Sequence, residues 1–174
     1  MYKGPKRKQI RLKNYDYSEP GDYFITICTK NRKCLLGNII DGKTVLNKLG
    51  LIVQKCWHDL ANHYSNVILD EFIIMPNHIH GIITILGNEN RRGGVTPPLQ
   101  DKSNKPTLGQ IIAYYKYQTT KQINKIKNTP GNPIWQRNYY EHIIRNEKSL
   151  NQIRDYIVSN PLTWSKDRNN PKNT

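Results

Sequence analysis

The segment Val67–Leu86, VILDEFIIMPNHIHGIITIL, carries the pattern that decides the fold. Its first part, Val67–Met75, is rich in β-branched and apolar residues and predicts a strand. Pro76 and Asn77 form a turn signal. The second part, His78–Leu86, predicts another strand that pairs with the first as a hairpin. The segment is therefore expected to supply a central hairpin of an antiparallel sheet.

The remaining elements follow from hydrophobic periodicity. They are a strand at Asp22–Thr29, an amphipathic helix from Val45 to about His63, a helix from Thr107 to about Lys127, an extended segment within Trp135–Arg145, and a last helix from about Glu147 to Asn160. Asn146 is the expected N-cap of the last helix, and Pro161 is expected to end it. The order predicts an α+β fold of the ferredoxin-like βαββαβ type. It has an antiparallel sheet with helices on one face, plus an added C-terminal helix.

The chain of 174 residues fits one domain. Residues 1–14 are expected to form a basic arm, 15–165 a single domain, and 166–174 a disordered tail. Residues 87–106 are rich in Gly, Pro and polar residues and predict a long surface loop. Nothing in the sequence resembles a linker that would divide the chain into two domains.

Charge indicates the class of partner. Lys and Arg number 27 against 13 acidic residues, a formal net charge of +14. Such an excess favours a polyanionic partner such as nucleic acid, and Lys6, Arg7 and Lys8 of the basic arm are candidate DNA contacts. No segment is apolar enough for a membrane span or a secretory signal. Three cysteines at unpatterned spacings argue against a disulfide framework, so a cytoplasmic setting is expected.

His78 and His80 lie two residues apart on the predicted strand. They therefore face the same side of the sheet, while Ile79 between them points into the core. Two imidazoles placed in this way can supply part of a metal coordination shell, although two histidines on a solvated face would give the same pattern. A histidine-triad hydrolase would need a third alternating histidine where Ile82 stands. Elsewhere, Cys56, His58 and His63 have no second cysteine pair and fit ordinary helix positions.

Two helices offer a tyrosine that could join the histidine pair. In the last helix Tyr156 and Asn160 lie one turn apart, on one edge of the apolar stripe. The earlier helix repeats the pattern L-x-Q-I-x-x-Y-x-x-x-[NQ], which gives Tyr114 and Gln118 the same geometry. Helical spacing alone does not choose between the two tyrosines.

Several motifs together resemble one family. MPNHIHGII, residues 75–83, is followed by WQRNYYEHIIRNEKSLNQIRDYIVSNPLTW, residues 135–164. In this order they resemble the single-tyrosine HUH transposases, and most closely the REP-associated tyrosine transposases and their insertion-sequence relatives. The resemblance covers about residues 15–165. It implies a domain that cuts and rejoins single-stranded or hairpin DNA, and family members are either monomers or homodimers.

The resemblance also implies roles for individual residues. His78 and His80 would bind Mg²⁺ or Mn²⁺, Asn160 would be the third ligand, and Tyr156 would be the nucleophile. The family places its tyrosine in the helix after the W-Q and E-H-I-I-R segments, which favours Tyr156 over Tyr114. Attack on DNA would give a 5′-phosphotyrosine and a free 3′-hydroxyl.

Three further side chains, Arg137, His142 and Arg145, are candidate DNA contacts. A non-catalytic nucleic-acid-binding protein remains an alternative, because ferredoxin-like folds also build RNA-recognition modules. An HUH replication initiator or relaxase would share the chemistry, but usually belongs to a larger chain.

Overall fold

The computed structural model describes residues 15–87 and 106–173. Its strands and helices are β1 (Gly21–Cys28), β2 (Gly37–Ile40), β3 (Lys43–Leu46), α1 (Lys48–His63), β4 (Val67–Met75), β5 (His78–Ile85), α2 (Leu108–Lys127), β6 (Tyr140–Ile144) and α3 (Glu147–Ser159). The described residues also form three short 3₁₀ helices: η1 (Lys30–Arg32), η4 (Asn160–Lys166) and η5 (Pro171–Asn173).

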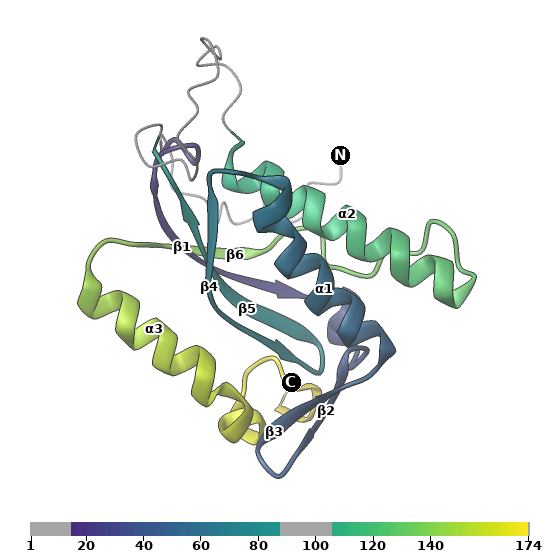
Figure 1. Ribbon diagram of the computed structural model, residues 1–174. Coiled ribbons are helices and arrows are strands. Elements are labelled where there is room, and N and C mark those ends of the chain that lie inside the picture. The colour runs from purple at the N-terminus through teal and green to yellow at the C-terminus, as the bar shows by residue number, and fades with distance from the viewer. Residues whose placement is uncertain (1–14, 88–105, 174) are drawn as a thin grey trace, which may run out of the picture.

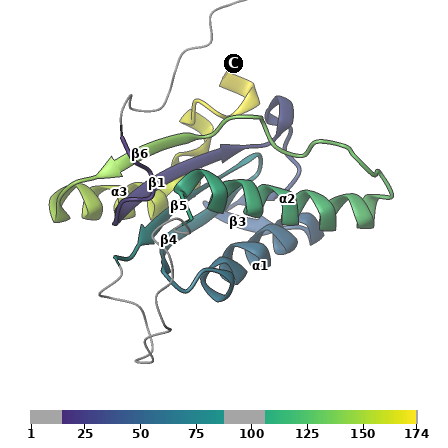
Figure 2. The same cartoon turned by 90° about the horizontal axis from the view of Figure 1, so that it is seen from above.

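A four-stranded antiparallel sheet in the order β4-β5-β1-β6 forms the centre of the molecule. Helices α1 and α2 cover one face of this sheet and α3 lies on the other (Figures 1 and 2). This is the strand order of a ferredoxin-like βαββαβ unit, in which each helix follows a strand and returns the chain to the sheet. The predicted α+β fold with an added C-terminal helix is confirmed.

The face under α1 and α2 holds the main core. Trp57 of α1 is fully buried and stacks on Phe72 of β4, with ring centroids 4.3 Å apart. Ile79, between the two histidines, is also fully buried and belongs to this core. Since alternate residues of a strand face opposite sides, the burial of Ile79 directs His78 and His80 to the face that α3 covers.

Helix α3 packs on that second face through a smaller apolar cluster. Its stripe of Leu150, Ile153 and Ile157 meets Phe24 of β1 and Ile82 of β5. The predicted N-cap is confirmed, because Asn146 Oδ1 accepts a hydrogen bond of 2.8 Å from the Ser149 amide. The α-helix ends at Ser159, close to the predicted end at Asn160. A 3₁₀ helix that contains Pro161 continues the helical path from Asn160.

The prediction that α1 starts at Val45 is wrong. Asn47 is the N-cap and its side chain accepts hydrogen bonds from the amides of Leu49 and Gly50, so the helix starts at Lys48. Val45 instead belongs to β3, which pairs with β2 in a small hairpin.

The C-terminal residues also differ from the prediction of a disordered tail. Residues 166–173 form turns and 3₁₀ helices, and Asn169 and Asn170 are buried. The backbone oxygen of Asn169 accepts a hydrogen bond of 2.6 Å from the buried Asn77 side chain. The tail is therefore attached to the turn that precedes the histidine pair.

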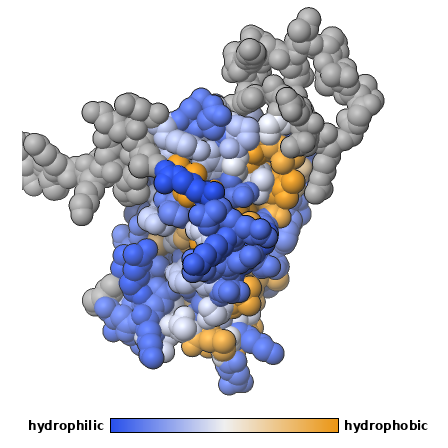
Figure 3. Space-filling model, turned by 90° about the vertical axis from the view of Figure 1, so that its left-hand side faces the viewer, coloured by the Kyte–Doolittle hydropathy of each residue, from blue (hydrophilic) through white to orange (hydrophobic). Residues whose placement is uncertain are grey.

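Two predicted regions lie outside the described residues. They are the basic arm at 1–14, with Lys6, Arg7 and Lys8, and all but the ends of the predicted loop at 87–106. Within the described part, no helix is both long and apolar enough to cross a membrane. The face in Figure 3 is mainly hydrophilic, with apolar residues in small separate patches.

Candidate active site

His78 and His80 lie side by side on β5, beneath α3. Both imidazoles are buried, at 0% and 1% exposure. Their Nε2 atoms are 3.0 Å apart, and the rings meet edge to face with centroids 4.6 Å apart. The two side chains thus converge on one point, as their i, i+2 spacing on a strand predicted.

Hydrogen bonds fix which nitrogen of His78 carries the proton. Asn77 Nδ2 donates to the backbone oxygens of Arg32 (2.9 Å) and Asn169 (2.6 Å). Because an amide nitrogen must face those carbonyls, Asn77 Oδ1 faces His78 Nδ1, at 2.8 Å. Nδ1 therefore donates to Asn77, and the lone pair of the neutral ring lies on Nε2.

His80 is held in a similar way. Its Nδ1 lies 2.8 Å from the Thr26 hydroxyl of β1, a buried partner whose oxygen can accept a hydrogen bond from the ring N–H. Hydrogen bonds from Nδ1 to oxygen partners are the usual means by which proteins orient metal-binding imidazoles. With Nδ1 protonated on both rings, two lone pairs would face each other across 3.0 Å. A shared cation would satisfy both.

Burial keeps both imidazoles neutral. It lowers the pKa of His78 to about 4, although the nearby Asp167 carboxylate acts in the opposite direction. It also lowers the pKa of His80 well below the usual value, and His78 and Arg168 add to this effect. Metal ligands must be deprotonated, so both rings are available for coordination at neutral pH.

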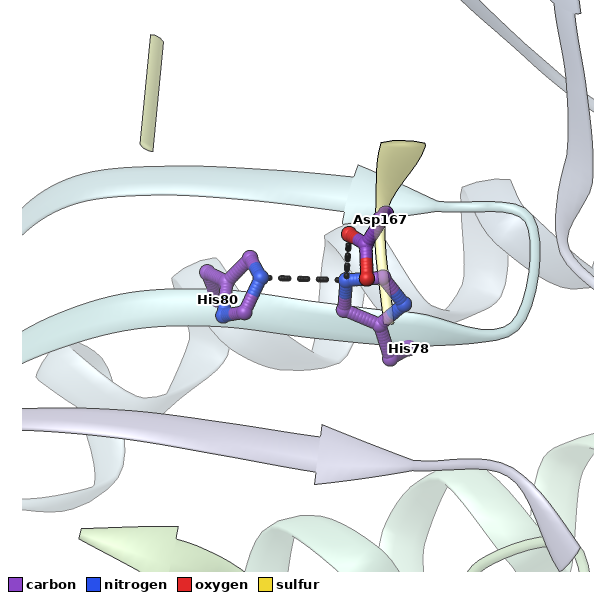
Figure 4. Close-up of side chains that lie close together, drawn as sticks. All are labelled: His78, His80 and Asp167. Atoms are coloured by element: carbon purple, nitrogen blue, oxygen red, sulfur yellow. Dashed lines mark hydrogen bonds and ion pairs between the residues drawn. The ribbon is translucent and has the colours of Figure 1, made fainter. Parts of the chain in front are cut away.

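Asp167 brings a carboxylate to the pair. Its Oδ2 faces His78 Nε2 (Figure 4), at a distance of 3.5 Å. The Asp167 side chain is only 5% exposed. One ligand atom from each of His78, His80 and Asp167 lies within 4.8 Å of the others. Asp167 Oδ2 is buried without a hydrogen-bond partner, which is costly unless a cation balances it. Sequence reasoning missed this residue because it lies in the predicted tail.

Asn160, the predicted third ligand, lies where α3 passes into η4 and is 2% exposed. Its Oδ1 is likewise buried without a hydrogen-bond partner. A hydrogen bond between its side chain and Tyr156 favours the charged form of the tyrosine. The environment of Asn160 is thus compatible with a ligand, and its role as one stays a prediction.

Tyr156 projects from α3 toward the histidines. Its hydroxyl lies 3.4 Å from His80 Nε2, and its ring packs edge-on against Phe24. The side chain is 45% exposed, so a substrate can reach it from solvent. Burial and the Asp167 carboxylate raise the pKa of Tyr156, while the hydrogen bond from Asn160 and the charge of Arg168 act against that rise.

The rival tyrosine lies elsewhere. Tyr114 belongs to α2, on the opposite face of the sheet from α3 (Figure 2). Its ring stacks on His63 of α1 with centroids 3.9 Å apart, and it packs against the main core. The structure brings Tyr156, not Tyr114, to the histidine pair.

A salt bridge fixes α3 to the sheet near Tyr156. The guanidinium of Arg154 binds both carboxylate oxygens of Asp70 on β4, at 3.0 and 2.5 Å. Asp70 lies where the register of β4 against β5 shifts. A two-point contact of this kind restrains orientation as well as distance.

The predicted DNA contacts at β6 are exposed. His142 shares a register position with Phe24 and therefore faces the same side of the sheet as the histidine pair. Arg137 and Arg145 lie before and after the strand. No contact of these three with the site is evident in the part of the chain that the structure describes, and their DNA-binding roles stay predictions.

Comparisons with known proteins show which proteins this chain resembles. No family model matches the sequence. An uncharacterized protein of Haemophilus influenzae is 46% identical over 169 residues, which cover 93% of this chain and 92% of that protein. A second H. influenzae protein, named "Putative REP-associated tyrosine transposase", is 27% identical over 161 residues, covering 87% of this chain and 77% of its own length.

Among solved structures, a REP-associated tyrosine transposase bound to a REP hairpin matches with a TM-score of 0.59 and 18% identity. The match covers 88% of this chain and 73% of that one. The fold is thus that of a tyrosine transposase, and the resemblance predicted from the motifs is confirmed. The chain belongs to one family with its H. influenzae relative of 46% identity.

Proposed function

We propose that the protein is a metal-dependent transposase that cleaves and rejoins single-stranded DNA through Tyr156. The observation that carries this proposal is the 3.4 Å contact between the Tyr156 hydroxyl and His80 Nε2. It joins an accessible tyrosine to a buried pair of imidazoles. The similarity to REP-associated tyrosine transposases supports the same role.

The side chains at the site fit a divalent cation. His78 and His80 would hold it through Nε2, and the unpartnered oxygens of Asp167 and Asn160 are candidate oxygen ligands. Two nitrogen and two oxygen donors suit Mn²⁺ at least as well as Mg²⁺, which prefers oxygen. When bound, such an ion offsets the negative charge of a phosphodiester and orients it for attack.

The chemistry of Tyr156 is a transesterification. Its phenolic oxygen would attack the phosphorus and form a phosphotyrosine bond, while the bond from phosphorus to the 3′-oxygen breaks. The proton of the phenol leaves to solvent or a nearby base, and the departing oxygen takes up a proton to become a 3′-hydroxyl. Because the ester is kept on the enzyme, a 3′-hydroxyl can reverse the reaction and rejoin a strand without ATP.

Local groups support Tyr156 as the nucleophile. A phenol with a pKa above its usual value is a poor nucleophile, so compensation is needed. The Asn160 side chain and the Arg168 charge both favour the phenolate. In-line placement beside the histidine pair would add the benefit of proximity.

A non-catalytic nucleic-acid-binding protein is the second candidate. Its support is the charge of +14, which serves binding and catalysis equally. It gives no account of a half-exposed tyrosine beside two neutral imidazoles with unpartnered oxygens around them. The catalytic proposal explains these features together.

The test is covalent adduct formation. Wild type, Tyr156→Phe and Tyr114→Phe would be incubated with Mn²⁺ and a pool of labelled DNA hairpins carrying randomised single-stranded flanks. A labelled protein band in a denaturing gel is expected for wild type and Tyr114→Phe, and not for Tyr156→Phe. An adduct that survives Tyr156→Phe would refute the assignment of the nucleophile. Binding without any adduct would favour the non-catalytic candidate.

A further inference from the structure

A pocket of about 250 Å³ lies beside the candidate active site, along β1 and the segment that leads into β6. Its walls combine guanidinium groups, side-chain amides and aromatic rings, from Arg32, Gln136, Asn138, Tyr139, Tyr140 and Arg168. The volume is below the roughly 300–1,000 Å³ of pockets for drug-sized ligands. A pocket of this volume suits one base-sized group.

The pocket borders the histidine pair through Thr26. This residue lines the pocket, and its hydroxyl also contacts His80 Nδ1 at 2.8 Å. Tyr140 on β6 faces Thr26 on β1 as its register partner. The Tyr140 phenol also lies near enough to Tyr156 to contribute to raising the pKa of that residue. A group in the pocket would thus lie next to a phosphate positioned for attack by Tyr156.

We propose that this pocket binds one unpaired nucleotide of the DNA strand, adjacent to the phosphate that Tyr156 attacks. This inference rests on the proposed function. The Tyr140 ring is 42% exposed, and an aromatic face of this kind stacks on a nucleobase of any sequence. The amides of Gln136 and Asn138 offer paired donors and acceptors for a base edge. Arg32 and Arg168 supply positive charge for the flanking phosphates.

The backbone of the pocket wall that carries the Gln136 and Asn138 side chains is held rigidly. Lys116 Nζ donates hydrogen bonds to the backbone oxygens of Gln136, Arg137 and Asn138, at 2.8, 3.2 and 3.3 Å. An ammonium group has three donors, so the three carbonyls use all of them. These bonds direct the Lys116 amine from α2 into the protein, beneath the pocket wall.

Further contacts hold the same segment from its other end. The Trp135 indole N–H donates to the Thr119 hydroxyl at 2.7 Å. The backbone N–H of Gln136 donates to the backbone oxygen of Cys28 at 2.9 Å. The W-Q-R-N motif is thus fixed to α2 and to β1 before any ligand binds. Preorganised polar groups of this kind suit recognition, and the motif gains a role as the wall of a nucleotide pocket.

The test uses the Tyr156→Phe protein, so that binding is measured without cleavage. A hairpin oligonucleotide that binds would be selected from a pool with randomised single-stranded flanks. Each unpaired position would then be made abasic in turn and its affinity measured by fluorescence anisotropy. One abasic position near the cleavage site is expected to weaken binding about 5- to 150-fold, the loss of one stacked base.

The pocket is tested by adding Tyr140→Ala to the same protein. The variant is expected to bind the intact oligonucleotide as weakly as the parent binds the abasic one, and to be insensitive to that abasic position. Tyr117→Ala, which removes a 61% exposed tyrosine from α2, is the matched control and should keep the parental profile. Asn138→Ala is expected to change which base is preferred at that position.

Different results would refute the pocket inference and the proposed function. If wild type forms a Tyr156-dependent adduct but Tyr140→Ala keeps the parental abasic profile, the pocket inference is refuted and the proposed function stands. If no single-stranded oligonucleotide from the pool binds, the proposed function itself is refuted. Circular dichroism of Tyr140→Ala would show whether a loss of binding reflects unfolding.

Discussion

The hydroxyl of Tyr156 lies 3.4 Å from His80 Nε2, although the two residues are 76 positions apart in the sequence. The contact exists because β5 directs His80 to one face of the sheet and the apolar stripe of α3 packs on that same face. One chain thus supplies both the accessible tyrosine and the imidazole pair.

Asp167→Asn is expected to weaken Mn²⁺ binding at least about tenfold. The Asp167 carboxylate is buried within 4.8 Å of both imidazole nitrogens, and removing its charge leaves the cation with fewer anionic ligands. The affinity would be measured by isothermal titration calorimetry. A loss of tenfold is typical even for partners that only orient ligands.

Two variants make this experiment decisive. Asp155→Asn changes an exposed carboxylate on α3 and is expected to leave the Mn²⁺ affinity unchanged. Asn160→Ala removes the ligand predicted from the sequence. If Asn160→Ala weakens binding and Asp167→Asn does not, the cation is held by the predicted set and Asp167 is only a neighbour.

Arg154→Met is expected to slow adduct formation more than it weakens DNA binding. The bidentate contact with Asp70 restrains α3 two residues before Tyr156, and a misplacement of about 1 Å at a reacting group can cost up to about 100-fold in rate. The rate would be measured in single-turnover reactions with labelled DNA. Arg154→Lys should recover only part of the loss, because lysine cannot bind both carboxylate oxygens in the same plane.

An exposed ion pair provides the control. Lys55 and Asp59 of α1 are one turn apart, far from α3 in the fold, and Lys55→Met is expected to leave the adduct rate at the wild-type value. Equal effects of Lys55→Met and Arg154→Met would indicate a general loss of charge or stability. In that case the salt bridge has no specific role in positioning Tyr156.

Much of the fold could be predicted from local sequence patterns. The hairpin of β4 and β5, the two core helices and α3 all follow from periodicity and turn residues. The small hairpin β2–β3 was missed, although Asp41-Gly42 was a usable signal. These two residues have φ of 48° and 70°, and an Asp-Gly pair between alternating apolar residues is typical of a two-residue hairpin turn.

The candidate site could be predicted only in part. The strand period predicted that His78 and His80 share one face. The helix period made both Tyr114 and Tyr156 candidates, and only the resemblance to the transposase family favoured Tyr156. Asp167 could not be found in this way. It lies in a segment without periodicity, and its position depends on tertiary hydrogen bonds such as that of Asn169 with Asn77. Local patterns contain no information about such contacts.

Gly81→Ala is expected to destabilise the fold by about 1–3 kcal/mol, the usual cost of overpacking. A Cβ at Gly81 would lie 2.5 Å from Cζ2 of Trp57. That indole is fully buried and stacked on Phe72, so it has little room to move. The free energy of unfolding would be measured by urea denaturation.

A second glycine separates crowding from backbone effects. At Gly87 the nearest atom to a new Cβ would be Cγ of Pro20 at 3.5 Å, an ordinary contact. Gly87→Ala is therefore expected to be close to neutral. If Gly81→Ala is no more destabilising than Gly87→Ala, the core around Trp57 is looser than the structure describes.

Acid is expected to destabilise the metal-free protein through His78. The folded-state pKa of about 4 lies below the unfolded value of about 6.5. Between these values the unfolded chain binds a proton that the folded protein does not, so the free energy of unfolding falls as the pH falls. The full difference corresponds to roughly 3 kcal/mol at most, and it already includes the opposing effect of the Asp167 charge, which favours the protonated ring.

Urea denaturation with a chelator at pH 7 and pH 5 would measure this slope. His78→Gln removes one of the two buried imidazoles and is expected to reduce the pH dependence, while His80, whose pKa burial also lowers, accounts for part of the remaining slope. His142→Gln, which replaces an exposed histidine on β6, should keep the wild-type slope. Adding Mn²⁺ should steepen it, because protons then compete with the cation for the same nitrogen. A wild-type slope in His78→Gln would mean that other groups cause the acid sensitivity and that His78 is not buried as a neutral ring.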